Sequence, residues 1–281
     1  MNDRIMQGKT VVITGASDGL GAEAARQLAG LGATVAVVGR SPQKTAAVAR
    51  QLGAEPLVAD FARLADVRAL ADTLLDRYPR IDVLANNAGV VLPRRIRTED
   101  GYDTMFQVNY LAPFLLTNLL LDRLTTAGPA RVITTSSKAN RSCGIDLGDL
   151  EGARQRSGML RYGMTKLQGI LFTRELARRT RGSGLTATAF HPGVVAATGI
   201  NRDSPLMAAL ARYRLLGKVS TVEQGAAPLV HLATMPDPQA TNGVYYDGLK
   251  PDGPVHRQAK DDQLATRLWE RTAELLDAQA A

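Results

Sequence analysis

The chain has 281 residues, 45% of them hydrophobic, which is enough for one sizeable α/β core in a single domain spanning residues 1–281. Its longest apolar run, residues 115–121, contains Thr117 and Asn118 and is far shorter than the ~18 residues of a membrane span, so no transmembrane segment is expected. The formal net charge is +7, but lysine and arginine are scattered without a nucleic-acid-binding motif, which predicts a solvated basic surface and no nucleic-acid partner.

A nucleotide-binding turn is predicted between the first strand and the first helix. Residues 9–14 are apolar and rich in β-branched side chains, residues 15–21 read GASDGLG, and apolar residues at helical spacing follow. Strand, glycine-rich turn and helix are the context of a dinucleotide-binding fingerprint, although the spacing is GxxxGxG rather than GxGxxG. Glycines allow the tight turn and the approach of a pyrophosphate to the helix start. The candidate contacts are Gly15, Ser17, Asp18, Gly19, Leu20 and Gly21.

An arginine ends the second predicted strand, residues 33–39, and indicates which dinucleotide binds. Many NAD sites carry an acidic residue at this point to bind the ribose hydroxyls. Arg40 stands there instead, and its guanidinium suits a 2′-phosphate. We therefore expect NADP(H) rather than NAD(H); the alternative is a solvated arginine at a strand end.

The remaining chain alternates between strands and helices. The pattern predicts helices over residues 42–52, 64–77, 98–124 (one long helix or two), 162–179, 222–233 and 261–278. Strands are predicted within residues 54–60 and over residues 81–85, 131–135, 185–190 and 244–246. Repeated βαβ units imply a doubly wound, mostly parallel seven-stranded sheet with helices on both faces. Residues 250–257 are interpreted as a loop within one domain.

Tyr162 and Lys166 are the main candidates for chemistry. They stand four residues apart in RYGMTK, so on a helix they share a face. A free tyrosine has a pKa of about 10, and a fixed positive charge nearby lowers that pKa. One buried ammonium together with a cationic cofactor is expected to bring the pKa of Tyr162 towards neutrality. The alternative is a surface tyrosine that happens to lie near a lysine.

Four motifs in order resemble the short-chain dehydrogenase/reductase superfamily. They are TGASDGLG at residues 14–21, NNAG at 86–89, Ser136-Ser137 at a strand end and YGMTK at 162–166. FQVNYLAPFLLT at 106–117, the long segment between Ser137 and Tyr162, and QATNGVYYDG at 239–248 are similar to its retinol dehydrogenase and protochlorophyllide reductase-like branch. The resemblance spans nearly the whole chain and implies a Rossmann fold.

The resemblance also implies a catalytic set. Ser137 is expected to hydrogen-bond the substrate oxygen, and the motif register favours it over Ser136. Tyr162 is expected to transfer the proton, and Lys166 to lower its pKa and bind the nicotinamide ribose. Asn109 matches the asparagine that holds a water in the proton relay; the alternative is an ordinary polar residue inside a helix.

Further cofactor contacts are implied along the same edge of the sheet. Asp60 and Phe61 follow the third strand and are expected near the adenine, although Asp60 is alternatively a helix N-cap. The PG turn after the sixth strand is expected beside the nicotinamide. In the family a threonine after this turn normally binds the carboxamide, and Thr198 stands one residue later than that position. The remaining candidates are Asn87, Ala88, Gly89, Pro192, Gly193 and Val195.

These features predict an NADP(H)-dependent oxidoreductase that acts on a hydrophobic ketone, aldehyde or alcohol. Residues 198–220 mix apolar side chains with arginines and are expected to form a substrate lid, or alternatively to pack on the core or on another subunit. Two other functions stay open. One is an epimerase, dehydratase or cyclase on the same fold, and the other is an NADP(H)-sensing protein without turnover. The resemblance further implies a homodimer or homotetramer.

The composition also bears on location and metals. Cys143 is the single cysteine, so no internal disulfide is expected and a reducing compartment fits. Three histidines with one cysteine show no metal-ligand spacing, so no metal site is expected. The first residues contain no apolar signal region, and a cytoplasmic location is therefore expected.

Overall fold

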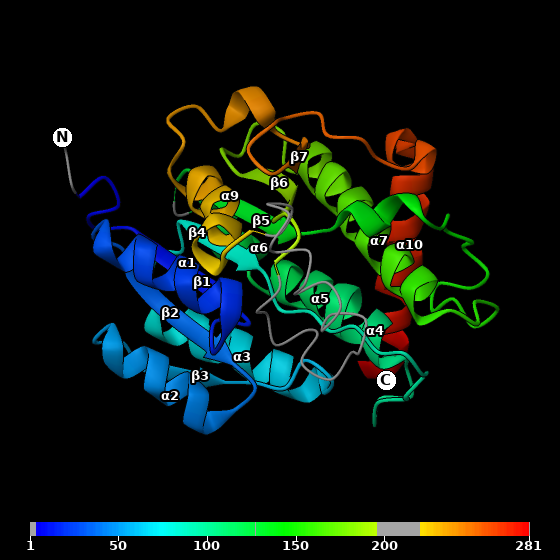
Figure 1. The fold of residues 1–281 in the computed structure, drawn as a ribbon, viewed down its shortest axis with the longest axis horizontal. Helices are drawn as coiled ribbons and strands as arrows, with labels where there is room; N and C mark the ends of the chain where they lie inside the picture. The colour runs from blue at the N-terminus through cyan, green and yellow to red at the C-terminus, as the bar shows by residue number, and fades with distance from the viewer. Residues whose placement is uncertain (1–3, 127, 196–219, 281) are drawn as a thin grey trace.

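The computed structural model describes residues 4–126, 128–195 and 220–280. Strands and helices alternate along the chain (Figure 1). The strands are β1 (Thr10–Thr14), β2 (Thr34–Gly39), β3 (Pro56–Val58), β4 (Val83–Asn86), β5 (Arg131–Thr135), β6 (Thr186–His191) and β7 (Tyr245–Asp247). The main helices are α1 (Gly19–Gly30), α2 (Pro42–Gln51), α3 (Leu64–Arg77), α5 (Ala112–Leu119), α6 (Leu121–Thr126), α7 (Gly158–Arg179), α9 (Val222–Thr234) and α10 (Asp262–Ala280).

All seven strands form one parallel sheet, which confirms the predicted fold class. The strand order is β3-β2-β1-β4-β5-β6-β7, so the direction of winding reverses between β1 and β4. In open α/β sheets, ligands bind beyond the carboxyl ends of the strands at such a reversal. The topology therefore places the candidate site at the ends of β1 and β4.

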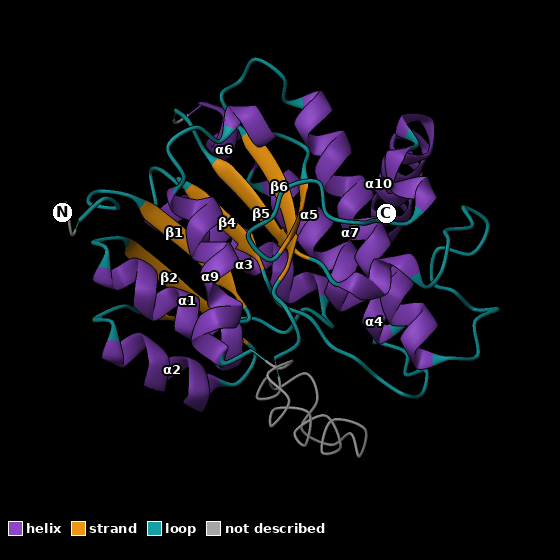
Figure 2. Cartoon of the chain, turned by 45° about the horizontal axis from the view of Figure 1, so that its top comes forward, coloured by secondary structure: helices purple, strands orange, loops and turns teal. Residues whose placement is uncertain are grey.

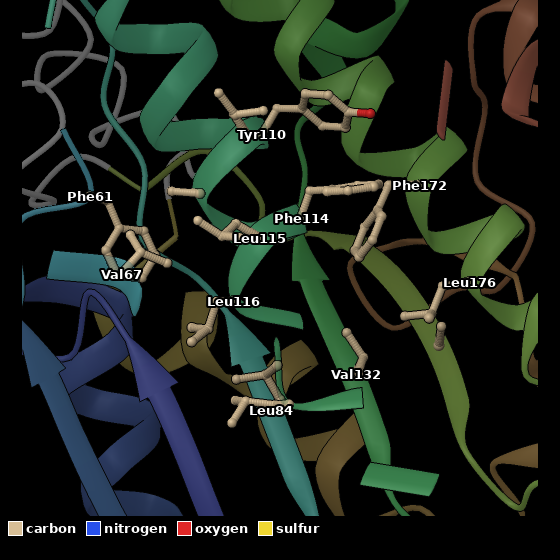
Figure 3. Close-up of a cluster of buried hydrophobic side chains, with 14 of the residues drawn as sticks. Phe61, Val67, Leu84, Tyr110, Phe114, Leu115, Leu116, Val132, Phe172 and Leu176 are labelled. Atoms are coloured by element: carbon tan, nitrogen blue, oxygen red, sulfur yellow. The ribbon is translucent and has the colours of Figure 1, made fainter. Parts of the chain in front are cut away.

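Helices cover both faces of the sheet (Figure 2). The cluster on one face contains Leu28 of α1, Val48 of α2 and Leu229 of α9. The cluster on the other face is larger and includes residues of α3, α5, α7 and α10. Figure 3 shows this second cluster, in which the rings of Phe114 and Phe172 lie 5.6 Å apart.

The long helix expected over residues 98–124 is divided and begins later. Asp103 accepts hydrogen bonds from the N–H groups of Met105 and Phe106, so the helix starts as α4 (Thr104–Phe106). A π-helical turn, η1 (Gln107–Leu111), follows and leads into α5. Turns of this kind are rare and often occur at functional sites, and this one carries Asn109.

The helix α10 packs on the outer side of α7 and α5. Trp269 stacks on Phe172 and meets Phe114 edge-on at 4.8 Å. The Tyr110 hydroxyl, in η1, hydrogen-bonds Thr272 at 2.7 Å. The helix α10 begins one residue later than the helix predicted over residues 261–278. Residues 198–219 of the expected lid lie outside the described residues.

Neither a membrane-spanning helix nor a metal-binding cluster occurs in the described ranges. No helix there combines the length and the apolar character needed to cross a membrane. No group of three or more histidine, cysteine, aspartate or glutamate side chains in those ranges is arranged to hold a metal ion.

Candidate active site

A threonine ties the ends of β1 and β4 together. Thr14 Oγ1 donates to the carbonyl oxygen of Ala85 at 3.1 Å and accepts from the N–H groups of Asn87 and Ala88, each at 3.0 Å. The Asn87 amide in turn donates to the Thr14 carbonyl oxygen at 2.9 Å. This network fixes the backbone at the point where winding reverses. Thr14 lies within the glycine motif, but sequence reasoning gave it no role.

The glycine turn between β1 and α1 has no room for larger residues. Gly15 and Gly19 have φ angles of 68° and 55°, which side chains disfavour. A Cβ on Gly21 would lie 2.4 Å from the Gly15 carbonyl oxygen, and one on Gly15 would lie 2.8 Å from the Cα of Ala88. The start of α1 then presents N–H groups that have no partner within the helix. This cradle fits the pyrophosphate of a dinucleotide.

Asp18 has a structural position in this turn. Its carboxylate caps α1 by accepting from the Gly19 N–H at 2.8 Å, and its second oxygen pairs with Lys44 at 3.0 Å. A carboxylate repels an anion, so the Asp18 side chain supports the turn and Lys44 offsets its charge. Lys44, on α2, was not identified from the sequence.

Arg40 follows the end of β2 and is exposed, with no hydrogen bond or ion pair to any described residue. Gly39 brings this strand end against the glycine turn, because a Cβ there would lie 2.6 Å from Ser17 Cβ. Arg40 therefore follows directly on the strand end that borders the glycine turn. This arrangement fits a phosphate on the adenosine ribose.

Asp60 and Phe61 follow β3, and their side chains lie in different surroundings. Asp60 Oδ1 accepts from the N–H of Ala62 at 3.0 Å, while α3 is preceded by Arg63, so Asp60 is not its N-cap. The Phe61 ring lies in the hydrophobic core and is 5% exposed (Figure 3). Any cofactor contact of Phe61 is therefore limited to its main chain.

The two serines after β5 have different surroundings. Ser136 is buried and its Oγ donates to the Lys166 carbonyl oxygen at 2.9 Å, which binds the strand end to α7. Ser137 is partly exposed, accepts from the N–H of Ala139 at 3.2 Å and interacts with the Tyr162 hydroxyl. Of the pair, Ser137 is the one placed to meet a substrate beside Tyr162.

Tyr162 and Lys166 lie on one face of α7, as their spacing predicts. Lys166 Nζ lies 5.5 Å from the centroid of the Tyr162 ring and donates to the Thr135 carbonyl oxygen at 2.9 Å. Burial raises the pKa of Tyr162 to about 12, although Ser137 acts to lower it. Burial also lowers the pKa of Lys166 to about 8. Burial is therefore the largest influence on the tyrosine pKa in the chain alone, and the expected lowering towards neutrality by Lys166 together with a cationic cofactor stays a prediction.

Asn109 joins η1 to the loop that follows β4. Its Oδ1 accepts from the Val90 N–H at 2.7 Å, and its Nδ2 donates to the Val90 carbonyl oxygen and to Thr165 Oγ1. A Cβ on Gly89 would lie 3.3 Å from Asn109 Oδ1 and 3.4 Å from Lys166 Nζ. Asn109, Gly89 and Lys166 therefore converge, but both amide protons of Asn109 are already used.

The turn that follows β5 and carries Ser136 and Ser137, called the serine turn below, is held from two sides. Asn140 is fully buried; its Nδ2 donates to the Ser137 carbonyl oxygen at 2.7 Å, and its Oδ1 accepts from the His256 N–H at 3.1 Å. On the other side a Cβ on Gly163 would lie 2.3 Å from the Ala139 carbonyl oxygen, so α7 touches the turn directly. Asn140 and Gly163 place Ser137 against Tyr162, and neither was identified from the sequence.

The PG turn follows β6, as expected. Gly193 has a φ of 86°, and Val195 is buried and pairs with Ser220. A Cβ on Gly225 of α9 would lie 2.5 Å from side-chain atoms of both Leu20 and Val195, so the turn packs between α9 and α1. Thr198 lies outside the described residues.

The match to a family decides what this arrangement is. The sequence model described as short chain dehydrogenase matches residues 9–208, more than half of the chain. The chain belongs to the short-chain dehydrogenase family. Its relatives place it in the retinol dehydrogenase-like branch, as the sequence motifs predicted.

Three of these relatives illustrate the range of the family. The chain is 37% identical to retinol dehydrogenase 13 of Homo sapiens, over 97% of this chain and 86% of that protein. It is 42% identical to DnrU of Streptomyces sp. (strain C5), which is named as a daunorubicin C-13 ketoreductase, over 95% and 92% of the two chains. A short chain dehydrogenase from Burkholderia cenocepacia J2315, solved in complex with NADP, is 27% identical with a TM-score of 0.69, over 86% and 96%.

Proposed function

We propose that this short-chain dehydrogenase is an NADP(H)-dependent oxidoreductase that transfers a hydride between the nicotinamide and a hydrophobic ketone, aldehyde or alcohol. One observation carries the proposal. The Tyr162 hydroxyl interacts with Ser137 while Lys166 Nζ lies 5.5 Å from its ring. A proton donor, a second hydroxyl and a buried cation meet at the end of β5, beside the dinucleotide cradle.

The residues divide the work with the cofactor. When bound, the nicotinamide cofactor supplies or accepts the hydride. Ser137 donates a hydrogen bond to the reacting oxygen and orients it. Tyr162 gives its hydroxyl proton to the developing alkoxide, or takes it back in the reverse direction. Lys166, held by the Thr135 carbonyl oxygen, keeps a positive charge near the phenolate that remains.

The protein's own electrostatics favour the proton-donating role. Burial raises the pKa of Tyr162 to about 12, so its hydroxyl is protonated at neutral pH. Reduction of a carbonyl requires a proton donor, whereas oxidation of an alcohol requires a base. The site before the cofactor binds therefore offers a protonated hydroxyl, which carbonyl reduction requires.

NADP(H) is proposed as the cofactor on account of Arg40. Arg40 is exposed, follows the strand end that borders the glycine turn, and has no partner among the described residues. A 2′-phosphate would take two hydrogen bonds from it in a planar fork. The Burkholderia cenocepacia relative was solved with NADP, which is in keeping with this choice.

A lipophilic substrate is proposed from the surroundings of Tyr162. Met159 stands three residues before Tyr162, on the adjoining part of the same helical face, and is 51% exposed. Val194, after the PG turn, is exposed as well. The names of the relatives also refer to retinol and to daunorubicin.

The test is a panel of aromatic and polyene ketones and aldehydes with NADPH. Absorbance at the nicotinamide band and product mass are followed together. Consumption of NADPH with a gain of two hydrogens supports the proposal. A rearranged or dehydrated product without net NADPH loss would identify an isomerase or dehydratase, and tight NADPH binding without product would identify a cofactor sensor.

Three further expectations stay proposals. One is a single domain over residues 1–281, which limited proteolysis would test. Another is a cytoplasmic location, which fractionation of the source cell would test. The third is a homodimer or homotetramer, which mass measurement in solution would test.

A further inference from the structure

His191, the last residue of β6, has buried ring nitrogens without partners. The residue is 5% exposed, and neither Nδ1 nor Nε2 has a hydrogen-bond partner among the described residues. Buried polar groups in folded proteins are nearly always hydrogen-bonded, so each exception calls for an explanation. His191 ends β6 at the carboxyl edge of the sheet, where open α/β sheets bind ligands, so an atom of the ligand can supply the missing partner.

The strand directs this imidazole towards the catalytic helix. Side chains alternate along a strand, so His191 lies on the face of Ala189 and opposite to Phe190. Ala189 belongs to the cluster built with α7, whereas Phe190 belongs to the cluster under α1 and α9. His191 is therefore on the side of the sheet that carries Tyr162.

The backbone places His191 next to the turn that carries Ser137, because the Ser136 N–H donates to the carbonyl oxygen of Phe190, the residue before His191, at 2.7 Å. Lys138, which directly follows Ser137, pairs with Asp247 of β7 at 3.1 Å. Both charges act on the imidazole, and the Gly248 N–H donates to the His191 carbonyl oxygen at 3.0 Å. Burial and the Lys138 charge lower the pKa of His191 to about 4, so the ring is neutral at neutral pH. A neutral imidazole offers one donor and one acceptor.

We propose that His191 is a substrate-contact residue that hydrogen-bonds a second oxygen of the substrate, a hydroxyl or carbonyl near the reacting carbon. Ser137 and Tyr162 bind the reacting oxygen, so the His191 imidazole is free to bind a second oxygen of the substrate. The enzyme would then select oxygenated lipophilic ketones over plain ones. The inference rests on the proposed carbonyl reduction and specifies its substrate class.

The test compares propiophenone with its 2-hydroxy and 3-hydroxy derivatives as substrates with NADPH. Wild-type kcat/KM is expected to be about tenfold or more higher for at least one hydroxy ketone, because a site with unpaired polar groups discriminates against an analogue that lacks the oxygen. His191→Phe removes both ring nitrogens and keeps a ring. That variant should lose most of this preference and leave kcat/KM for propiophenone within about twofold. His191→Gln, which keeps a donor and an acceptor, should restore part of it.

Two readouts separate this role from others. The ligand-free Tm of His191→Phe should equal or exceed that of wild type, by up to about 2–4 °C, because the substitution removes unpaired buried nitrogens. The NADPH Kd should not change. His231→Phe, at an exposed histidine on α9, is the matched control and should change none of these quantities.

Several results would overturn the inference. No wild-type preference for either hydroxy ketone would do so, as would an equal loss on all three ketones in His191→Phe. A clearly weaker NADPH Kd would assign the imidazole to the cofactor, and a markedly lower Tm would make it a structural residue. Failure of wild type to reduce any ketone, in contrast, would overturn the proposed function itself and this inference with it.

Discussion

The Lys166 ammonium donates a 2.9 Å hydrogen bond to the carbonyl oxygen of Thr135, at the end of β5. The strand thereby holds a buried cation that sits one helical turn from Tyr162 on α7. The same strand end is bound to the helix a second time, because Ser136 donates to the Lys166 carbonyl oxygen. The distance between the cation and the phenol is thus set by the sheet as well as by the helix.

Ketone reduction should lose rate above about pH 8. Burial lowers the pKa of Lys166 to about 8, so its charge disappears as the pH rises through that value. With saturating NADPH, kcat/KM measured from pH 6 to 10.5 should fall on the alkaline side. In Lys166→Arg this fall should move to higher pH, since arginine stays charged. A flat wild-type profile from pH 7 to 10 would contradict the assignment.

Stability should respond to the same cation in the opposite direction. Between pH 8 and 10.5 the unfolded chain keeps the Lys166 proton while the folded chain loses it, so this group makes the folded state more stable as the pH rises. Lys166→Met should therefore increase the free energy of unfolding at pH 7, by up to about 3 kcal/mol. Urea unfolding of wild type and Lys166→Met at pH 7 and at pH 10.5 should show that the variant's gain in free energy of unfolding is smaller at pH 10.5. An equal gain at both would refute the effect.

Tyr162→Phe should remove the proton donor and little else. Turnover of any ketone that wild type reduces should fall by about 10²–10⁴-fold. The NADPH Kd, measured by fluorescence, should stay within about threefold, because the cradle lies on β1 and α1. Wild-type turnover in this variant would sink the assignment of Tyr162 as the acid.

Two glycines of α7 offer a matched pair of substitutions. Gly163→Ala puts a Cβ within 2.3 Å of the Ala139 carbonyl oxygen and should push the serine turn away from Tyr162. We expect kcat to fall by about 10–100-fold, with a stability loss of roughly 1–3 kcal/mol. Gly169→Ala meets only Thr134 Cγ2 at 3.4 Å and should be neutral or stabilising by about 0.5–1 kcal/mol. Kinetics and thermal unfolding of both variants test this contrast, and equal effects would contradict it.

Arg40→Ala should change cofactor choice. Loss of charge-assisted hydrogen bonds to a 2′-phosphate should lower kcat/KM for NADPH by about tenfold or more and leave NADH nearly unaffected. Arg50→Ala, at an exposed arginine at the other end of α2, is the control and should affect neither cofactor. A similar loss with both cofactors in Arg40→Ala would show that the guanidinium does not read the phosphate.

Much of the fold was predictable because its signals are local. The patterns of apolar strands and amphipathic helices predict the bounds of ten elements to within two residues, and βαβ repetition implies a parallel sheet. The start of α4 was not predicted, since it depends on the Asp103 cap at the end of an irregular segment. The π-turn at Asn109 left no signal in the periodicity, because it inserts within a continuous apolar helix.

The candidate site was predictable only where residue types form a motif. Ser137, Tyr162, Lys166 and the glycines belong to such motifs, although their catalytic roles stay proposals. Asn140 and Lys44 act through contacts with residues distant in sequence, and His191 stands out only by its buried ring nitrogens without a partner among the described residues; no spacing reveals these features. Helical spacing indicates that a charge lies near Tyr162, but it says nothing of the burial that raises the pKa of this hydroxyl in the chain alone.

The position of α10 has a consequence for synthesis on the ribosome. Trp269 packs on Phe172 of α7, and Thr272 hydrogen-bonds Tyr110 beside Asn109. The aromatic flank of the catalytic helix is therefore bare until residues 262–280 have been translated. A growing chain that already contains Ser137, Tyr162 and Lys166 would expose this apolar surface to chaperones. Activity should therefore appear only once α10 has packed against it.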